Sequence, residues 1–261
     1  MADWGNDLTL ALDLASAADE VTMRRFGAVD LAVSTKPDLT PVSDADTAVE
    51  AAFRARVAQM RPGDAVVGEE YGETGNSPRR WIVDPIDGTK NFVRGAPVWA
   101  TLVALQVDND IVLGVVSAPA LGRRWWASRG AGAWTSYDAG EPRRLQVSQV
   151  ATLDDAFVSY SSLTGWEQQH RLDALLDLSR RVWRTRAFGD FWSHMLVAEG
   201  AVDASCEPEV SLWDLAALQP IVEEAGGRFS DLSGVDRADG GSVVCSNGLL
   251  HDDVVAALAA R

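Results

Sequence analysis

The chain has 261 residues, of which 47% are hydrophobic and 23% are charged, which is the composition of an ordinary soluble globular protein. Its net charge of −15 repels the phosphate backbone of nucleic acids, and no apolar run reaches the roughly 18–20 residues that span a bilayer, so neither nucleic acid nor membrane is an expected partner. Because the N-terminus lacks the basic and apolar regions of a secretion signal, and Cys206 and Cys245 are the only cysteines, we expect a cytoplasmic location.

The first half of the chain shows two helical patterns followed by several strand patterns. Apolar residues at helical spacing predict one helix from about Leu8 to Arg25, capped by Asn6 or Asp7, and a second from near Ser43 to a stop at Pro62. The extended runs AVVGEE and RWIVD come next. The runs VWATLVALQV and IVLGVVSA, separated by the turn signal DND, predict a long antiparallel hairpin, and RRWWASRG and AGAW predict further strands of the same sheet.

The second half alternates strands and helices more evenly. FVSYSS, VDASCE and SVVCSN predict strands, whereas Glu167–Trp183, GDFWSHMLVAEG, Trp213–Ala225 and the final residues predict helices. Such alternation is typical of a layered α/β fold. Because the order of predicted helices and strands differs between the two halves, we expect two subdomains, residues 1–150 and residues 151–261.

Acidic residues stand at four places where an extended run ends or a helix begins, which are the edges where layered α/β folds build their sites. The four places are Asp46, Glu69 with Glu70, Asp84 with Asp87, and Asp214.

Each of these acids also has a purely structural explanation. Ser43 and Asp46 have the spacing of a capping box, and Asp214 suits the first turn of its helix. The pair Glu69-Glu70 is compatible with a solvated loop, and Asp87-Gly88 with a simple turn. These alternatives stay open on the sequence alone.

The segment WIVDPIDGTKNF, residues 81–92, is more specific than the isolated acids. Pro85 fixes the turn, so the carboxylates of Asp84 and Asp87 can approach one point, where two buried anions are unfavourable unless a cation lies between them. Oxygen ligands suit Mg²⁺ or Mn²⁺ rather than zinc, and the histidines lack metal-ligand spacing. If a helix begins at Gly88-Thr89, its free N–H groups favour a phosphate beside the metals. The segment therefore predicts a metal-dependent phosphatase site.

Together with an upstream GEE and a downstream WD that opens a helix, this segment resembles the inositol monophosphatase superfamily of metal-dependent, lithium-sensitive phosphatases over nearly the whole chain. The resemblance implies a five-layered αβαβα sandwich, a homodimer, and two or three Mg²⁺ ions per site, with Mn²⁺ as a substitute. It also implies a small-molecule phosphate monoester as the substrate, hydrolysed by an activated water without a covalent phosphoenzyme.

The resemblance assigns roles to individual residues. It implies that Asp46, Glu69 and Thr89 are catalytic, with Asp46 and Thr89 orienting the attacking water, and that Glu70 lies behind the ligands. The implied metal ligands are Glu69, Asp84, the carbonyl of Ile86, Asp87 and Asp214, and the implied phosphate-binding residues are Asp87, Gly88 and Thr89.

The segment FGDFWSHMLVAEG, residues 188–200, resembles histidinol-phosphate phosphatases within this superfamily, as do TKPDLTPV and SAPALGRRWWA. An anionic Asp190 suits a cationic leaving alcohol, and Glu207 matches the position where the family contacts that alcohol. Phe188 and Trp192 are expected near the imidazole of such a substrate. A helix N-cap is the alternative explanation of Asp190.

Three other functions remain open. An inositol-1-phosphate phosphatase would use the same site, and a nucleotide or sugar bisphosphatase comes next. The non-enzymatic alternative is a regulatory binding protein of the same fold. Against this last alternative, every predicted metal position is intact, and the net charge of −15 disfavours RNA.

Overall fold

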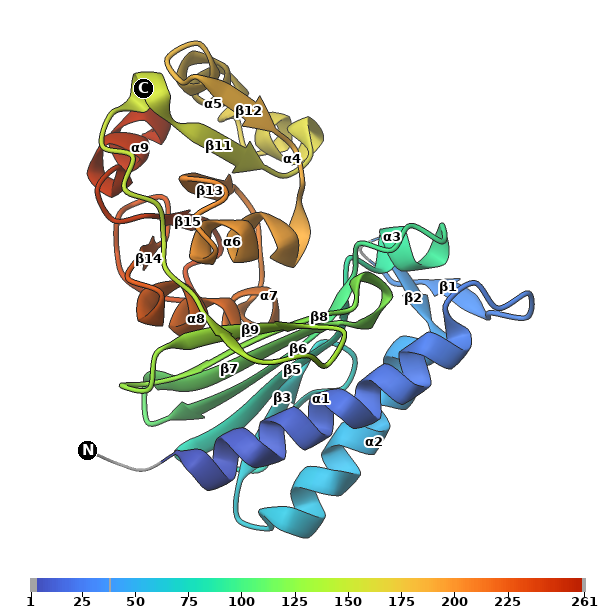
Figure 1. Ribbon diagram of the computed structural model, residues 1–261. Helices are drawn as coiled ribbons and strands as arrows, with labels where there is room; N and C mark the ends of the chain where they lie inside the picture. Colours follow the sequence, from blue (N-terminus) through green and yellow to red (C-terminus); the bar gives the residue numbers. More distant parts are fainter. Residues whose placement is uncertain (1–3, 38, 260–261) are drawn as a thin grey trace.

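A computed structural model describes residues 4–37 and 39–259 (Figure 1). Helices and sheets alternate in layers: two helices, an eight-stranded sheet, a central helical layer, a five-stranded sheet and an outer helical layer. The αβαβα sandwich implied by the resemblance is confirmed. Within the part of the chain described, no helix is long and apolar enough to cross a membrane.

The larger sheet has the strand order β10-β9-β8-β7-β6-β5-β3-β4. Neighbouring strands are antiparallel, except that β3 and β5 are parallel. The predicted hairpin is confirmed as β6 and β7, and the two tryptophan-containing runs after it are β8 and β9. The strands are β3 (Ala65–Gly68), β4 (Gly72–Thr74), β5 (Arg79–Asp87), β6 (Ala100–Val107), β7 (Asp110–Ala118), β8 (Arg123–Ser128), β9 (Ala133–Tyr137) and β10 (Arg143–Arg144).

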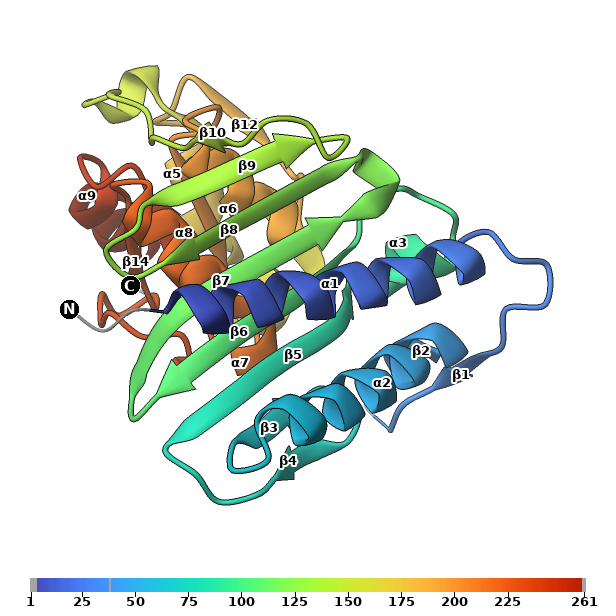
Figure 2. The same ribbon diagram turned by 60° about the horizontal axis from the view of Figure 1, so that its bottom comes forward.

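Helices α1 (Gly5–Arg25) and α2 (Asp44–Met60) lie side by side across one face of this sheet (Figure 2). Their apolar sides turn inward, and Leu14 and Phe53 share one buried cluster with Trp81 of β5. The short hairpin of β1 (Val33–Thr35) and β2 (Pro41–Ser43) connects the two helices.

The predicted cap of the first helix is wrong, whereas the predicted start of the second is confirmed. Trp4 occupies the N-cap position of α1 without a side-chain hydrogen bond. Asp7 instead accepts hydrogen bonds from Arg61 and Arg79, each at 3.0 Å, and so joins α1 to α2 and β5. Ser43 is the N-cap of α2, as the capping-box spacing predicts.

The smaller sheet has the strand order β12-β11-β13-β15-β14. Strand β11 runs parallel to β12 and β13, and β15 runs antiparallel to β13 and β14. The predicted strands of the second half are confirmed as β11, β13 and β15, whereas β12 and β14 were not predicted. The strands are β11 (Phe157–Tyr160), β12 (Arg184–Arg186), β13 (Ala204–Glu207), β14 (Arg228–Ser230) and β15 (Val243–Ser246).

Apart from α3, the remaining helices form the central and outer layers (Figure 1). Helix α3 (Thr89–Val93) lies at the end of the larger sheet, beside the β1–β2 hairpin. The central helices are α6 (Asp190–Ala198), α7 (Leu212–Leu215) and α8 (Leu218–Glu224), and the outer helices are α4 (Leu163–Gln168), α5 (Leu172–Ser179) and α9 (His251–Leu258).

Two predicted helices are interrupted. The helix expected over Glu167–Trp183 is wrong as one element: α4 and α5 are separated at His170, whose φ of +55° lies in the left-handed region and cannot continue a helix. The helix expected over Trp213–Ala225 is divided into α7 and α8 at Ala216-Ala217. The spacing of apolar residues does not reveal such breaks, because apolar residues continue at helical spacing on both sides of each break.

The two sheets are formed by residues on either side of position 150, but they share one hydrophobic core. A single buried cluster contains Leu102 and Trp125 of the larger sheet, Met195 of α6, Ile221 of α8 and Val243 of the smaller sheet. The division into residues 1–150 and residues 151–261 therefore remains a prediction about folding units.

Gly114 of β7 allows the α7–α8 segment to approach the larger sheet. A Cβ atom at this position would lie 2.1 Å from the carbonyl oxygen of Ala217, which belongs to rigid backbone. We expect Gly114→Ala to destabilise the protein by about 1–3 kcal/mol through overpacking, measured by urea or thermal unfolding. Gly63→Ala is the matched control, because nothing lies within 4 Å of its added Cβ. Equal stability of the two variants would contradict the prediction.

Candidate active site

Pro85 interrupts strand β5 between the two acids of the DPID segment. The pairing of β5 with β6 is regular up to Asp84 and shifts register before Asp87. Such a bulge changes the alternation of side chains, so acids that are three positions apart can point to one region. The Thr101 hydroxyl of β6 donates to the Pro85 carbonyl oxygen at 2.8 Å and holds the bulge in place.

The two acids of β5 meet Asp214, which helix α7 brings from the other end of the chain. One carboxylate oxygen from each of Asp84, Asp87 and Asp214 lies within 4.8 Å of the other two. We call these three residues the acid group. Asp84 and Asp87 are only 1% and 9% exposed, so water screens the repulsion between their charges only weakly.

Backbone amides hold all three carboxylates of the acid group. In each case one oxygen accepts the amide hydrogen bond, and the side chain is fixed without cancelling its charge. The bonds run from Ile86 to Asp84 at 2.9 Å, from Phe191 to Asp87 at 2.6 Å and from Ser211 to Asp214 at 2.7 Å. Ser211 and Asp214 form a capping box, so the predicted first-turn role of Asp214 is confirmed.

Burial is the main cause that raises the pKa of each acid in the group. The charges of Glu69, Asp87 and Asp214 raise the pKa of Asp84 further. Burial raises the pKa of Asp87 as well, and the charges of Asp190 and Asp214 add to it. Burial raises the pKa of Asp214 to about 7, against the bond from Ser211 that lowers it.

The acid group has the chemistry of a divalent-cation site. Among residues 4–37 and 39–259, no lysine or arginine forms an ion pair with any of the three carboxylates. Their repulsion is therefore uncompensated by the chain itself. Because all the donors are carboxylate oxygens, the group suits a hard cation rather than zinc. These residues could hold a metal ion.

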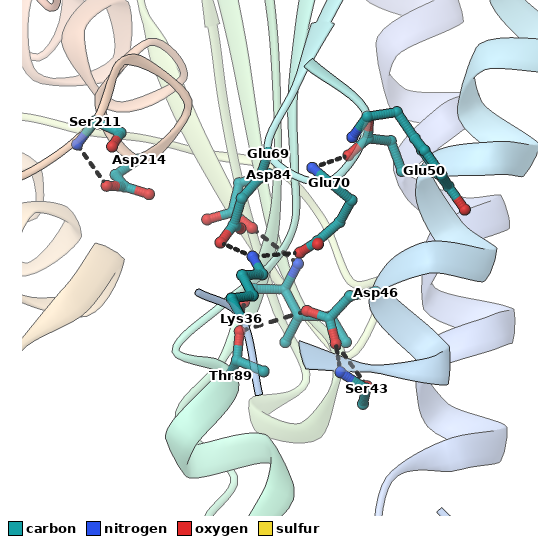
Figure 3. Close-up of polar contacts among 12 residues, drawn as sticks. Lys36, Ser43, Asp46, Glu50, Glu69, Glu70, Asp84, Thr89, Ser211 and Asp214 are labelled. Carbon is teal, nitrogen blue, oxygen red and sulfur yellow. Dashed lines mark hydrogen bonds and ion pairs between the residues drawn. The ribbon is translucent and has the colours of Figure 1, made fainter. Parts of the chain in front are cut away.

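Glu69 and Glu70 share one lysine instead of facing solvent (Figure 3). The Lys36 ammonium donates to Glu69 Oε1 at 2.6 Å and to Glu70 Oε1 at 2.7 Å. Their side chains are 20% and 6% exposed, so the solvated-loop explanation is wrong. Burial raises the pKa of Glu70 to about 7, although the bond from Lys36 lowers it. Glu69 is outside the acid group, but its charge raises the pKa of Asp84 and is therefore close by.

Glu50, to which the sequence analysis gave no role, supports the glutamate pair from helix α2. It is fully buried and accepts the amide hydrogen of Glu70 at 2.7 Å and that of Tyr71 at 3.1 Å. Arg54 donates to the same carboxylate at 2.8 Å. A Cβ atom on Gly68 would lie 2.2 Å from Glu50 Oε1, so the glycine of the GEE sequence makes room for this carboxylate.

The two carboxylate oxygens of Asp46 have different partners. Oδ2 accepts hydrogen bonds from the amide and hydroxyl of Ser43 at 2.8 and 2.6 Å, so the capping-box explanation is confirmed. Oδ1 faces the Thr89 hydroxyl at 3.4 Å, and that hydroxyl also donates to the Ile86 carbonyl at 2.9 Å. The structural and the chemical explanations of Asp46 are therefore compatible (Figure 3).

Gly88 turns the chain from β5 into helix α3. Its φ of +81° is in the left-handed region, and an added Cβ would lie 3.0 Å from the Val98 carbonyl oxygen. Helix α3 begins at Thr89, so the condition for free N–H groups at this point is met. The first amides of a helix have no partner within it, so those that follow Gly88 are donors beside the acid group.

Asp190 begins helix α6 and points toward the loop at Gly88. The N-cap is Gly189, and Asp190 is the first residue of the helix, so the N-cap explanation of Asp190 is wrong. Asp190 Oδ2 accepts from Asn91 Nδ2 at 3.2 Å. Burial raises the pKa of Asp190 to about 6, and the charge of Glu207 contributes. Asp190 has a φ of +50°, a conformation that needs support from its surroundings.

Glu207, at the end of β13, lies close to both Asp190 and the acid group. Its charge raises the pKa of Asp87, Asp190 and Asp214. The residue is 8% exposed, and His194 Nε2 lies 3.0 Å from its Oε1.

The structure thus brings the predicted residues together in three adjoining parts: the acid group, the Asp46–Thr89 pair and the Asp190–Glu207 pair. Glu69 lies near the acid group, since its charge raises the pKa of Asp84, and its Oε1 accepts a hydrogen bond from Lys36. Four residues of the site have roles that were not predicted: Lys36, Glu50, Asn91 and His194. Three of them lie in segments that the sequence had singled out, Lys36 in TKPDLTPV, Asn91 in WIVDPIDGTKNF and His194 in FGDFWSHMLVAEG, whereas Glu50 carried no signal.

Comparisons with known proteins identify the family of the chain. The model of the inositol monophosphatase family matches residues 4–261. The chain is 57% identical to the histidinol-phosphatase of Streptomyces coelicolor, with 100% of both chains covered, and 59% identical to that of Mycobacterium tuberculosis, with 97% and 98% covered. Among solved structures, the extragenic suppressor protein suhB of Bartonella henselae superimposes with a TM-score of 0.88 at 30% identity, covering 98% of this chain and 99% of its own. The chain belongs to the inositol monophosphatase family.

Proposed function

We propose that this protein is a metal-dependent phosphatase that hydrolyses L-histidinol phosphate to L-histidinol and phosphate, a step of histidine biosynthesis. The observation that carries the proposal is the pairing of half-buried Asp190 with buried Glu207 beside the acid group, which offers negative charge for the leaving alcohol. Histidinol carries an ammonium and an imidazole, so two carboxylates favour it over an uncharged polyol through charge-assisted hydrogen bonds. The two relatives named histidinol-phosphatase support the same substrate.

The proposed cofactor is Mg²⁺, two or three ions per site, with Mn²⁺ as a substitute. The chain would hold these ions through Glu69, Asp84, the Ile86 carbonyl, Asp87 and Asp214. Glu69 keeps Oε2 for this purpose, because only its Oε1 contacts Lys36. When bound, divalent cations supply the positive charge that activates the attacking water and stabilises the leaving oxygen.

Asp46 and Thr89 are the proposed pair that orients the attacking water. The Thr89 hydroxyl has one proton and lies near two acceptors, the Ile86 carbonyl and Asp46 Oδ1. Because the Ile86 bond is the shorter one, Asp46 Oδ1 is left as an acceptor for a water proton. Ser43 fixes the opposite oxygen, so this acceptor has a defined direction.

Gly88 and Thr89 are the proposed phosphate-binding residues, together with Asp87. Their amides open helix α3 directly after the bulge that carries the acids. The left-handed conformation of Gly88 turns the chain at that point, so its neighbouring N–H groups lie close to the acid group.

A homodimer and a cytoplasmic location are also proposed. The family resemblance supports the first, and light scattering of the purified protein tests it. The second is supported by Cys206 and Cys245, which are both buried and free, as expected in a reducing compartment.

Phosphate release from a substrate panel tests the proposed function. With Mg²⁺ present, we expect histidinol phosphate to be hydrolysed with a higher kcat/KM than inositol 1-phosphate, fructose 1,6-bisphosphate or 3′-phosphoadenosine 5′-phosphate. A chelator should abolish all turnover. Comparable turnover of inositol 1-phosphate would overturn the substrate and leave the phosphatase class intact, and no turnover of any ester would support the regulatory alternative.

Asp84→Asn tests whether the acid group is the metal site. We expect it to abolish turnover while the circular dichroism spectrum and the oligomeric state are retained, since one charge is lost without a change of shape. Surviving activity would remove Asp84 from the proposed ligands.

Asp190→Asn tests the selection of a cationic alcohol. A hydrogen bond to a charged group contributes about 1.5–3 kcal/mol, so kcat/KM for histidinol phosphate should fall on the order of tenfold to a hundredfold. A generic ester such as p-nitrophenyl phosphate should be affected far less. Asp173→Asn is the matched control, because Asp173 is an exposed acid in the first turn of α5. Equal losses on both esters would assign Asp190 a purely structural role.

The pKa shifts predict how pH and metal affect stability. The pKa of Asp214 is raised from 3.8 to about 7, so the native protein holds a proton that the unfolded chain releases between these values. Stability without metal should therefore be greatest below about pH 4 and fall as the pH rises toward 7, as far as this carboxyl is concerned. Mg²⁺ binds the ionised form, so it should raise Tm more at pH 7.5 than at pH 5. A Mg²⁺ effect independent of pH, or one unchanged in Asp214→Asn, would contradict this prediction.

A further inference from the structure

Two of the chain's histidines are buried with both ring nitrogens engaged. His251, the first residue of α9, is 0% exposed and lies between two serines, with Nε2 at 2.8 Å from Ser230 Oγ and Nδ1 at 3.0 Å from Ser246 Oγ. His194 of α6 is 1% exposed, and its Nδ1 lies 2.8 Å from Ser205 Oγ. The second partner of His194 is a carboxylate: Nε2 lies 3.0 Å from Glu207 Oε1.

The geometry of strand β13 explains how one ring reaches both partners. Ser205 and Glu207 are two positions apart on β13, so their side chains are on the same face of the strand. Helix α6 packs on that face, and His194 contacts both side chains. Cys206, between them, points the other way into the cluster with Trp166 and Leu178.

The carboxylate determines which ring nitrogen carries the hydrogen. An ionised carboxylate can only accept, so Nε2 donates to Glu207 Oε1, and in the neutral imidazole Nδ1 then accepts from the Ser205 hydroxyl. If the ring is protonated, both nitrogens carry hydrogens and the donation to Glu207 remains. In either state Glu207 Oε1 is engaged, and Oε2 is the oxygen left for another partner.

We propose that His194 is a positioning residue that holds the Glu207 carboxylate in the orientation needed to bind the cationic group of the leaving alcohol. This inference rests on the proposed function, in which Glu207 contacts that alcohol. Without the bond from His194, the Glu207 side chain would be free to rotate. Its carboxylate would also lose a hydrogen-bond donor in a buried, acid-rich region, where another donor is hard to find. Loss of His194 should therefore weaken binding of the cationic group and should not slow the hydrolysis of phosphate esters in general.

The alternative explanation is that His194 is only a buried polar residue with satisfied hydrogen bonds. His251 offers the matched control for that explanation, because it is as deeply buried, also has both nitrogens engaged and has serines alone as partners. His194→Phe and His251→Phe each remove two buried hydrogen bonds, and only the first acts on a carboxylate beside the acid group.

The experiment compares kcat and KM for histidinol phosphate and for p-nitrophenyl phosphate in the full-length Mg²⁺-loaded protein and its variants, with Tm measured alongside. We expect His194→Phe to raise KM for histidinol phosphate on the order of tenfold, which is about 1.4 kcal/mol, with little change in KM for p-nitrophenyl phosphate. His194→Gln keeps a donor toward Glu207 and should recover most of this loss. His251→Phe should lower Tm without changing the ratio between the two esters.

A double-mutant cycle shows whether His194 acts through Glu207. Glu207→Gln should itself reduce the preference for histidinol phosphate, and His194→Phe should then cause no further reduction. Additive losses, or equal effects of His194→Phe on both esters, would overturn the inference. A wild-type protein that does not prefer histidinol phosphate would overturn the proposed function and this inference with it, whereas a preference that survives His194→Phe would overturn the inference alone.

Discussion

The mutual repulsion of three carboxylates, two buried and one half-buried, is the constraint on which the candidate site depends. Asp84, Asp87 and Asp214 place oxygens within 4.8 Å of one another, where burial already disfavours their charged forms. Such an arrangement is unfavourable without a cation, so the fold must hold it against its own electrostatics. It does so with a backbone amide on each acid, from three separate elements of the chain. Packing of the rest of the core therefore offsets the repulsion of these carboxylates, which keeps them in position to bind a cation.

Carboxylates in this site divide their two oxygens between structure and chemistry. Asp46 gives one oxygen to the cap of helix α2 and keeps the other toward Thr89. Asp214 likewise caps α7 with one oxygen while its carboxylate joins the acid group. Glu207 is bonded to His194 through one oxygen. A structural role for an acid is therefore no argument against a chemical one, because fixing one oxygen gives the second a defined direction.

The residues expected to select the substrate are mechanically joined to the acid group. The amide of Phe191 in helix α6 donates to Asp87, and the preceding residue, Asp190, accepts a hydrogen bond from Asn91 of helix α3. The two halves of the chain also share one hydrophobic cluster. A substitution of Asp190 that changes its shape should therefore also disturb the acid group, so substitutions that keep the side-chain shape are the informative ones.

The sequence by itself determined the layered fold class, most of the strands and helices, and the DPIDGT segment with its acids, because local spacing and turn chemistry encode these features. It could not place the break at His170, since the apolar pattern continues across it. Nor could it assign roles to Lys36, Glu50 and His194, whose partners lie 33, 20 and 13 positions away along the chain. Only the tertiary structure decided which carboxylates are compensated by a cationic or donor side chain and which are left facing one another. Electrostatic energy depends on distance in space and on burial, and the order of residues in the chain specifies neither directly.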